Sequence, residues 1–286
     1  MTSAVLPPDR PGSPGSLIVT FAGLHLRRLG GWIAVADLLR ALAAADLGST
    51  AGRQALTRLK TRGFLTAEKH GTAAGYTLTE FGRRDLAGGD RRIFTAPDRD
   101  PAAGWALAVF SVPESDRDHR HRLRTLLAGS GFGAVANGVW IAPRPLAGPT
   151  RAELAAGDLD RYVTWFGVQN GDDPGTPSPI AAPGPAQVAR WWDLAGLAQL
   201  YRSFLSVWGD VDPATVLRDG GEQAAFVHDL RLVDAWRVFP RTDPGLPLPL
   251  LPDDWPGVAA WDTFTRLRDA WAEPGRVWVD ALVART

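Results

Sequence analysis

The first third of the chain repeats its apolar residues with the period of a helix and then, briefly, with that of a strand. The pattern predicts, in order, a helix opened by Ser16, a helix over 35–45, a helix from Ser49 or Thr50 to Arg62, a hairpin of strands 64–69 and 76–78 with a turn through 70–75, and a helix from its cap Thr79 to Arg92. Gly63 ends the third helix, because the position after a helix favours a residue that adopts positive φ. A helix-turn-helix followed by a hairpin is the winged-helix arrangement, whose second helix enters the DNA major groove.

The third helix of this arrangement has two unlike faces. The side expected to face the other helices carries Gly52, Leu56, Leu59 and Gly63. The opposite side carries Thr50, Arg53, Gln54, Thr57 and Thr61. Arg53 suits guanine, Gln54 suits adenine, and Thr57 suits a thymine methyl group or a phosphate. An ordinary solvated helix face has the same polar pattern, and Arg58 suits either DNA contact or an ion pair within the domain.

The middle of the chain has the order βαββαβ, which is the ferredoxin-like pattern. The expected elements are a strand over 105–112, a helix over 117–128, strands over 131–135 and 138–141, a helix over 150–157 and a strand over 162–168. The last hundred residues are mainly helical and rich in aromatic residues. Their expected helices cover 185–207, 222–239 and 257–272.

Proline- and glycine-rich stretches divide these parts and predict an α+β multidomain protein. The expected divisions are a disordered leader over 1–15, a winged helix-turn-helix domain over 16–95, a ferredoxin-like dimerisation domain over 102–170, and a helical C-terminal domain over 185–286 that is a candidate for effector binding and dimer contact. Residues 1–15 lack an apolar signal-peptide region, and no stretch is apolar enough for a membrane span. We therefore expect a cytoplasmic protein without membrane contact.

Charge is distributed unevenly along the 286 residues. The chain has 31 basic and 31 acidic side chains, yet residues 1–95 have 13 basic and 7 acidic ones, a net charge of +6, which leaves −6 for the remainder. Such asymmetry between segments points to nucleic-acid binding by the basic part. The chain has no cysteine, which excludes disulfides, zinc ribbons and thiolate catalysis.

Arginines interleave with the aromatic residues of the C-terminal helices, and a cavity with such walls suits an anionic, partly apolar small molecule. The candidate effector-binding residues are Arg190, Trp191, Arg202, Arg237 and Trp255. The alternative is ion pairing between helices, with acids such as Asp193, Asp229 and Asp234 as partners. The sequence does not separate these two possibilities.

Known catalytic patterns are missing from the chain. It has no P-loop, no H-E-x-x-H and no G-x-S-x-G motif. The five histidines are dispersed, and the i, i+2 spacing of His119 and His121 directs them to different sides of a helix. We expect no enzyme activity, no metal and no cofactor.

Short motifs in all three parts resemble the phenylacetic-acid-degradation repressor (PaaX) family over nearly the full length. They are Ser16–Phe21 with Gly30–Gly31, Arg53–Leu59 with Gly63–Leu65, Tyr76–Gly82, Gly131–Gly133, Gly138–Pro143, Asp243–Pro247 and Leu250–Gly257. The resemblance implies the three-part fold above and a dimeric transcriptional repressor that an aryl-CoA thioester releases from DNA. It also matches Thr50, Arg53, Gln54, Thr57 and Arg58 to the recognition helix of the family.

Two departures accompany this resemblance. The hairpin tip Gly71–Gly75 lacks the arginines expected in relatives, which weakens the case for strong phosphate contact there. The middle part also resembles CRISPR-associated ferredoxin-like endoribonucleases, but Ser111 stands where those enzymes have a carboxylate, which disfavours a metal-dependent nuclease.

The sequence therefore favours a ligand-responsive regulator that binds a palindromic operator in double-stranded DNA as a homodimer, with an acyl-CoA such as phenylacetyl-CoA as effector. The complete set of expected DNA-binding residues is Ser49, Thr50, Arg53, Gln54, Thr57, Arg58, Lys69 and His70. The alternatives are a DNA-binding interaction module without a small ligand and, less favoured, a hydrolase or nuclease built on the ferredoxin-like domain.

Overall fold

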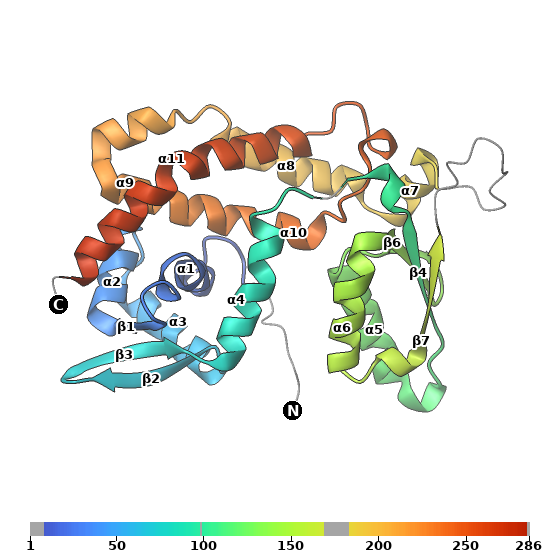
Figure 1. Ribbon diagram of the computed structural model, residues 1–286, viewed down its shortest axis with the longest axis horizontal. Helices are drawn as coiled ribbons and strands as arrows, with labels where there is room; N and C mark the ends of the chain where they lie inside the picture. The colour runs from blue at the N-terminus through green and yellow to red at the C-terminus, as the bar shows by residue number, and fades with distance from the viewer. Residues whose placement is uncertain (1–8, 98, 169–182, 285–286) are drawn as a thin grey trace. The chain divides into compact units, whose positions relative to one another are not determined.

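The computed structural model describes residues 9–97, 99–168 and 183–284 (Figure 1). Its contacts divide the chain into two compact units. We call Ala96–Tyr201 with Phe239–Gly257 the central unit, and Ala4–Thr95 with Arg202–Val238 and Val258–Thr286 the N/C unit. The N/C unit therefore joins both ends of the chain, and each unit is described below by itself.

The N-terminal part of the N/C unit contains the expected helices and hairpin. Its elements are α1 (Pro14–Phe21), one π-helical turn η1 (Ala22–Leu26), β1 (Trp32–Ala34), α2 (Val35–Ala44), α3 (Ser49–Thr61), β2 (Leu65–His70), β3 (Ala73–Leu78) and α4 (Glu80–Ile93). The caps explain two boundaries. The Thr79 hydroxyl accepts a hydrogen bond from the backbone N–H of Gly82, and Gly63 has a φ of +74° after α3.

Two expectations for this part are wrong. The first helix begins at Pro14, with Ser13 as its cap, because the Ser13 hydroxyl accepts from the Ser16 backbone N–H. The hairpin turn is much shorter than 70–75, since β2 and β3 pair as far as His70 and Ala73. The strand β1 is a further difference. Its three residues pair antiparallel with β3, which gives the sheet order β1-β3-β2, and so short a strand leaves no periodic signal in the sequence.

The C-terminal helices also differ from expectation. They are α7 (Pro185–Trp191), α8 (Leu194–Trp208), α9 (Pro213–Trp236), α10 (Phe239–Thr242) and α11 (Gly257–Val283). The single helix expected over 185–207 is thus two helices, and α9 begins earlier than residue 222, with a kink at Gly221, whose φ is +60°. The helix α11 continues past Pro274 to Val283.

The helices α9 and α11 share one hydrophobic core with the N-terminal helices. Phe226 and Leu230 of α9 and Val279 of α11 lie in the same buried cluster as the apolar residues of α1, α2 and α3. The expected division into a winged-helix domain over 16–95 and a separate helical domain over 185–286 remains a prediction. In the structure, the contacts group residues 202–238 and 258–286 with the N-terminal part.

Two polar networks reinforce this packing. The buried carboxylate of Asp234 on α9 accepts hydrogen bonds from the hydroxyls of Ser16, at 2.5 Å, and Thr20, at 2.8 Å, and from the backbone N–H of Gly12, at 2.6 Å. Within residues 9–15 of the expected disordered leader, Gly12 is thus bound to α9 and α1 begins at Pro14, whereas residues 1–8 lie outside the described part of the chain.

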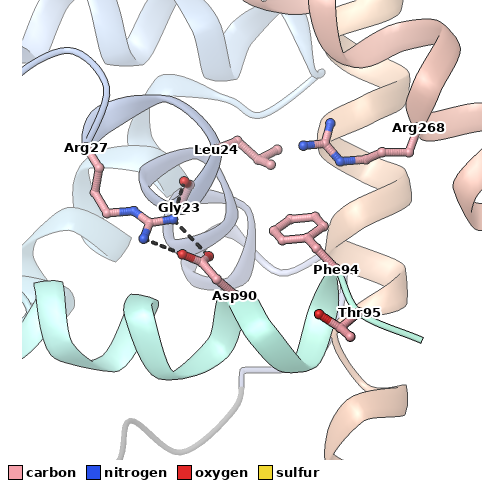
Figure 2. A pocket seen from close by; sticks show the side chains of 7 residues that line it. All are labelled: Gly23, Leu24, Arg27, Asp90, Phe94, Thr95 and Arg268. Atoms are coloured by element: carbon pink, nitrogen blue, oxygen red, sulfur yellow. Dashed lines mark hydrogen bonds and ion pairs between the residues drawn. The ribbon is translucent and has the colours of Figure 1, made fainter. Parts of the chain in front are cut away.

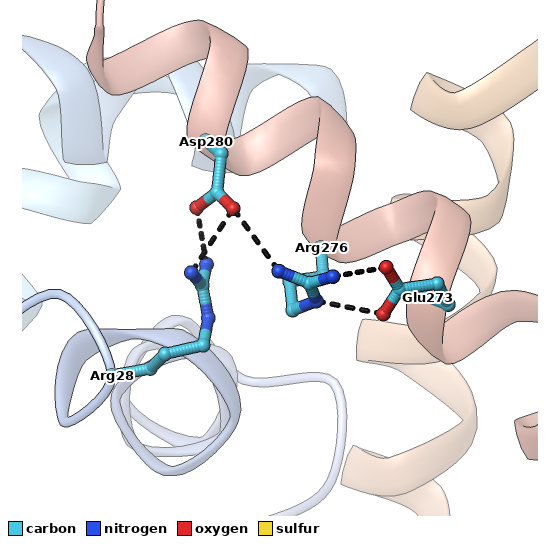
Figure 3. A network of polar contacts seen from close by, with 4 residues as sticks. All are labelled: Arg28, Glu273, Arg276 and Asp280. Carbon is cyan, nitrogen blue, oxygen red and sulfur yellow. Dashed lines mark hydrogen bonds and ion pairs between the residues drawn. The ribbon is translucent and has the colours of Figure 1, made fainter.

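The second network joins the end of η1 to α11. The guanidinium of Arg28 binds the Asp280 carboxylate through two nitrogens. The same carboxylate accepts a hydrogen bond from Arg276, which also forms an ion pair with Glu273 (Figure 3). These side chains are partly exposed, so we assign the network a role in orienting α11 rather than a large contribution to stability.

The central unit contains the expected order of strands and helices. Its elements are β4 (Trp105–Phe110), α5 (Arg117–Gly129), β5 (Gly133–Ala136), β6 (Val139–Pro143), α6 (Ala147–Ala156) and β7 (Val163–Val168). The sheet has the order β5-β6-β4-β7, and every neighbouring pair is antiparallel. Leucines of α5 and α6 cover one face of the sheet, where they form a core with Ala108, Phe110 and Trp140.

Candidate nucleic-acid interface

The helix α3 has the two faces that its sequence predicts. Gly52, Ala55, Leu56 and Leu59 are buried against the rest of the N/C unit. The outward-facing positions are all exposed, and they are Ser49, Thr50, Arg53, Gln54, Thr57, Arg58 and Thr61. Gly63 is the exception to the prediction, because it lies exposed beyond the helix end instead of facing the other helices.

Several cations of this surface have no carboxylate partner anywhere in the part of the chain that the structure describes. They are Arg53, Arg58 and Lys60 on α3, and Lys69 on β2. The arginines at 27, 28, 40, 62, 83 and 84 of the same unit are instead each paired with an aspartate or glutamate. Arg58 therefore makes no ion pair within the unit. Lys60 is absent from the sequence-based set, although it is exposed on α3.

Hydrogen bonds within α3 limit what its threonines offer to DNA. The Thr57 hydroxyl donates to the carbonyl of Arg53 at 3.0 Å, and the Thr61 hydroxyl donates to the carbonyl of Thr57 at 3.1 Å. Each hydroxyl proton is thus used inside the helix. What remains exposed at Thr57 is its methyl group and an accepting oxygen, which favours contact with a thymine methyl group over donation to a phosphate.

The hairpin presents Lys69 and His70 differently. Lys69 is exposed, whereas the His70 ring stacks on the Trp32 indole with centroids 4.2 Å apart, and its Nε2 lies 3.0 Å from the Glu68 carboxylate. Gly75 makes this arrangement possible, since a Cβ there would lie 2.4 Å from the indole. His70 is therefore held within the hairpin, and Lys69 is the free cation of this strand.

The turn that leads into α3 is held by α9. Asp46 adopts a φ of +60°, and Arg231 of α9 donates to the carbonyl of Ala45 at 3.1 Å and to the Asp46 carboxylate at 2.7 Å. Close packing against α2 also fixes the position of α3. A Cβ atom at Gly52 would lie only 3.0 Å from the Leu39 side chain of α2, so the two helices approach closely at this glycine. The direction of α3 thus depends on contacts from both ends of the chain.

The structure does not gather the five candidate effector residues into one described cavity. Arg237 donates to the Thr20 hydroxyl of α1 at 2.8 Å and lies 3.7 Å from Asp234, one of the acids named in the alternative, but this ion pair lies at the end of one helix and does not join two. Trp255 is buried beside Tyr201. Trp191 packs edge-on against its neighbour Trp192, and both Arg190 and Arg202 are exposed.

Other expectations concern absences. Among the described residues, no group of three or more histidine, cysteine, aspartate or glutamate side chains is arranged to hold a metal ion, and His119 lies instead 3.3 Å from the Tyr162 hydroxyl. Within the same ranges, no helix combines the length and the apolar character that a membrane span needs.

Comparison with known proteins matches all three parts of the chain to one family. Residues 13–82 match the model described as PaaX-like protein, residues 98–179 match the PaaX protein central Cas2-like domain, and residues 192–281 match the PaaX-like protein C-terminal domain. The transcriptional repressor PaaX of Escherichia coli K12 is 26% identical over 257 residues, which cover 87% of this chain and 78% of that protein.

A solved structure supports the fold independently. An uncharacterized protein from Mycobacterium tuberculosis, 22% identical, superposes with a TM-score of 0.57 over 94% of this chain and 99% of that one. The central unit accordingly has a Cas2-like domain within a mixed α+β protein. Since three models of one family together match residues 13–82, 98–179 and 192–281, this protein belongs to the PaaX family.

Proposed function

We propose that the chain is a sequence-specific DNA-binding transcriptional repressor in which α3 is the recognition helix and β2–β3 is the wing of a winged helix-turn-helix. The observation that supports this most directly is the exposed face of α3, where cations without carboxylate partners stand beside groups that suit base edges. The related Escherichia coli protein is named a transcriptional repressor, which agrees with a regulator rather than an enzyme. A cytoplasmic location follows from this proposal.

Substitution of single residues on α3 tests the proposed contacts. We expect Arg53→Ala to weaken binding to the operator by roughly 1–3 kcal/mol and to relax the preference for one base, as loss of a guanine contact does. Lys60→Ala should weaken binding to all sequences alike and lower the salt dependence. Arg218→Ala is the matched control, because Arg218 is an exposed arginine on α9 that pairs with Asp219. Unchanged affinity and base preference for Arg53→Ala would remove Arg53 from the base-reading role.

We also propose a homodimer that reads the two halves of a palindromic operator, with the central unit as its dimerisation domain. The antiparallel order β5-β6-β4-β7, with α5 and α6 covering one face, supports a ferredoxin-like layout. The other face carries Leu107, Val109 and Val139 beside Phe166, which is 54% exposed. A second copy of the chain would cover this apolar face.

Size measurement tests the dimer. We expect Phe166→Glu to shift the full-length protein from dimer to monomer in light scattering after gel filtration, because a carboxylate on this face opposes burial. Leu248→Glu, at an exposed apolar residue on another element of the central unit, is the control. A dimer that persists in Phe166→Glu would place the contact elsewhere.

An acyl-CoA thioester such as phenylacetyl-CoA is the effector that we propose, on the strength of the family resemblance. Release of the protein from operator DNA by phenylacetyl-CoA, and not by CoA alone, would support it. The residues Arg190, Trp191, Arg202, Arg237 and Trp255 remain a prediction for the effector site. DNA binding that no acyl-CoA changes would favour the interaction module without a small ligand.

A further inference from the structure

The turn between α2 and α3 is closed by the two backbone hydrogen bonds of a Schellman motif. The N–H of Asp46 donates to the Ala43 carbonyl at 3.0 Å. The N–H of Leu47 donates to the Leu42 carbonyl at 3.0 Å. The motif requires a left-handed residue directly after the helix cap, and Asp46 takes this place with a φ of +60°. Glycine adopts this conformation without strain and aspartate does not, so other contacts have to hold Asp46 there.

Arg231 of α9 provides such a contact. Its Nη2 donates to the Ala45 carbonyl at 3.1 Å and to the Asp46 carboxylate at 2.7 Å. One guanidinium nitrogen therefore binds the cap of α2 and the left-handed residue that follows it. The positive charge of Arg231 also interacts favourably with the carboxyl end of α2, where the helix dipole is negative.

The contact of Arg231 differs from that of Arg27 in what it joins. Arg27 also binds a carbonyl and a carboxylate, those of Gly23 at 2.9 Å and of Asp90 at 2.5 and 2.9 Å (Figure 2). Gly23, however, precedes Arg27 by four residues in the same helical segment. Both acceptors of Arg231 belong to the turn between α2 and α3, so this arginine fixes a turn from a helix far away in the sequence.

The turn packs directly against the first part of α3. A Cβ atom at Gly52 of α3 would lie 3.8 Å from the Leu42 side chain and 4.0 Å from the Leu47 side chain. Leu47 follows Asp46, so the backbone conformation of Asp46 determines where the Leu47 side chain meets α3. A change in this conformation therefore changes the direction of α3.

The helix α9 is itself fixed against the N-terminal helices. Leu230 is buried in the core that these helices form, and the Asp234 carboxylate accepts hydrogen bonds from Ser16 and Thr20 of α1. Arg231 lies between these two anchored residues in the sequence, and its side chain is 46% exposed. The helix α9 thus holds α1 through its buried residues and the turn before α3 through Arg231.

We propose that Arg231 is a positioning residue for α3: it holds Asp46 in the left-handed conformation and thereby fixes the direction in which α3 presents its exposed face. The consequence for DNA binding rests on the proposed function, whereas the restraint on the turn does not. Reading of bases requires one direction of α3, so operator binding depends on the restraint. Binding to DNA of unrelated sequence, which depends on phosphate contacts, does not.

Operator binding by variants of the full-length protein tests the role of Arg231. We expect Arg231→Ala to weaken operator binding roughly 5-fold, the scale of an exposed ion pair with one further hydrogen bond, and to leave binding to unrelated DNA nearly unchanged. Arg231→Lys keeps a cation beside Asp46 and should recover part of the loss. Arg218→Ala is the control, because Arg218 is another exposed arginine of α9 and pairs with Asp219.

A matched pair of second substitutions separates positioning from charge. Arg231→Ala leaves the Asp46 carboxylate unpaired close to the proposed DNA-binding surface, where its charge alone would repel DNA. Asp46→Gly and Asp46→Ala both remove that charge, but only glycine adopts the φ of +60° without strain. In the Arg231→Ala background, we expect Asp46→Gly to restore operator binding and Asp46→Ala to leave it weak.

Two results would overturn the proposal. Restoration by both second substitutions would assign the effect to charge. An equal loss of affinity for operator and unrelated DNA in Arg231→Ala, with a weaker salt dependence, would assign it to a direct phosphate contact of Arg231.

Hydrogen exchange of the free protein tests the restraint without DNA. The amides of Asp46 and Leu47 donate within the turn, so we expect Arg231→Ala to raise their exchange rates in nuclear magnetic resonance, and Arg218→Ala to leave them unchanged. Equal rates in Arg231→Ala and wild type would overturn the proposal. A wild-type protein that prefers no DNA sequence would instead refute the proposed repressor, so the two failures are distinguishable.

Discussion

His25 is a buried histidine with nothing to bind, and its replacement has a calculable effect on stability. The side chain lies in the π-helical turn η1, is 3% exposed, and has no hydrogen-bond partner for either ring nitrogen among the residues described. It packs between the rings of Phe21, at 5.2 Å, and Phe226, at 5.6 Å. The perturbation we consider is His25→Leu, which keeps an apolar side chain of similar size in this place.

The environment of His25 sets the size of its pH-dependent contribution to the unfolding free energy. Burial is the main cause that lowers its pKa from 6.5 to about 3; Arg28 and Arg268 lower it further, and Asp280 opposes them. Between pH 6.5 and 3, therefore, His25 is protonated in the unfolded chain and neutral in the folded chain. Stability falls with pH by about 1.4 kcal/mol per unit between pH 6.5 and 3, which is a loss of about 2 kcal/mol at pH 5.

Asp229 acts in the opposite direction and has to be separated from this effect. Burial raises its pKa from 3.8 to about 6, against the influence of Arg268, so the folded state gains stability as pH falls from 6 towards 3.8. The wild-type curve alone thus mixes two groups. The difference between His25→Leu and wild type removes the contribution of Asp229 and isolates that of His25.

Urea denaturation of the full-length protein at pH 7, 6 and 5 measures this difference. At pH 7 we expect His25→Leu to be at least as stable as wild type, because loss of the ring contacts is offset by removal of unsatisfied polar groups, each of which costs about 1–3 kcal/mol. The advantage should grow by about 2 kcal/mol by pH 5. His25→Gln is the control, since it loses the titration and keeps a buried polar group. A difference that stays constant with pH would refute the reasoning.

Three further predictions concern the packing of the N/C unit. Asp234→Ala removes the acceptor of two buried hydroxyls and a backbone N–H, so we expect a loss of about 3–5 kcal/mol in unfolding free energy, with a smaller loss for Asp234→Asn. Gly75→Ala places a Cβ within 2.4 Å of the Trp32 indole; the tryptophan fluorescence should change and affinity for operator DNA should fall, and an unchanged spectrum would contradict the stack. A fragment of residues 1–97 lacks α9 and α11, and should show no cooperative thermal transition in circular dichroism, whereas a sharp transition would show that the N-terminal core is complete by itself.

Local patterns in the sequence determined much of the fold. The period of the apolar residues located α2, α3, α4, the strands β4 to β7 and the helices α5 and α6, because the spacing of side chains along a helix or strand depends on the backbone alone. The exposed face of α3 follows from the same spacing. The glycine after α3 and the threonine before α4 were identifiable because caps act within four residues of the helix end.

Only the tertiary structure decided how the two ends of the chain combine. Three kinds of contact join residues far apart in sequence. Phe226 and Val279 are buried in the core of the N-terminal helices, the Asp234 carboxylate accepts a hydrogen bond from the Ser16 hydroxyl, and β1 pairs with β3. Such contacts depend on which apolar faces pack together. The helical period of apolar residues identifies an apolar face on a helix, but it does not identify the element against which that face packs. For the same reason the sequence showed His25 as one histidine among five, and the structure alone placed it in the buried core between the rings of Phe21 and Phe226.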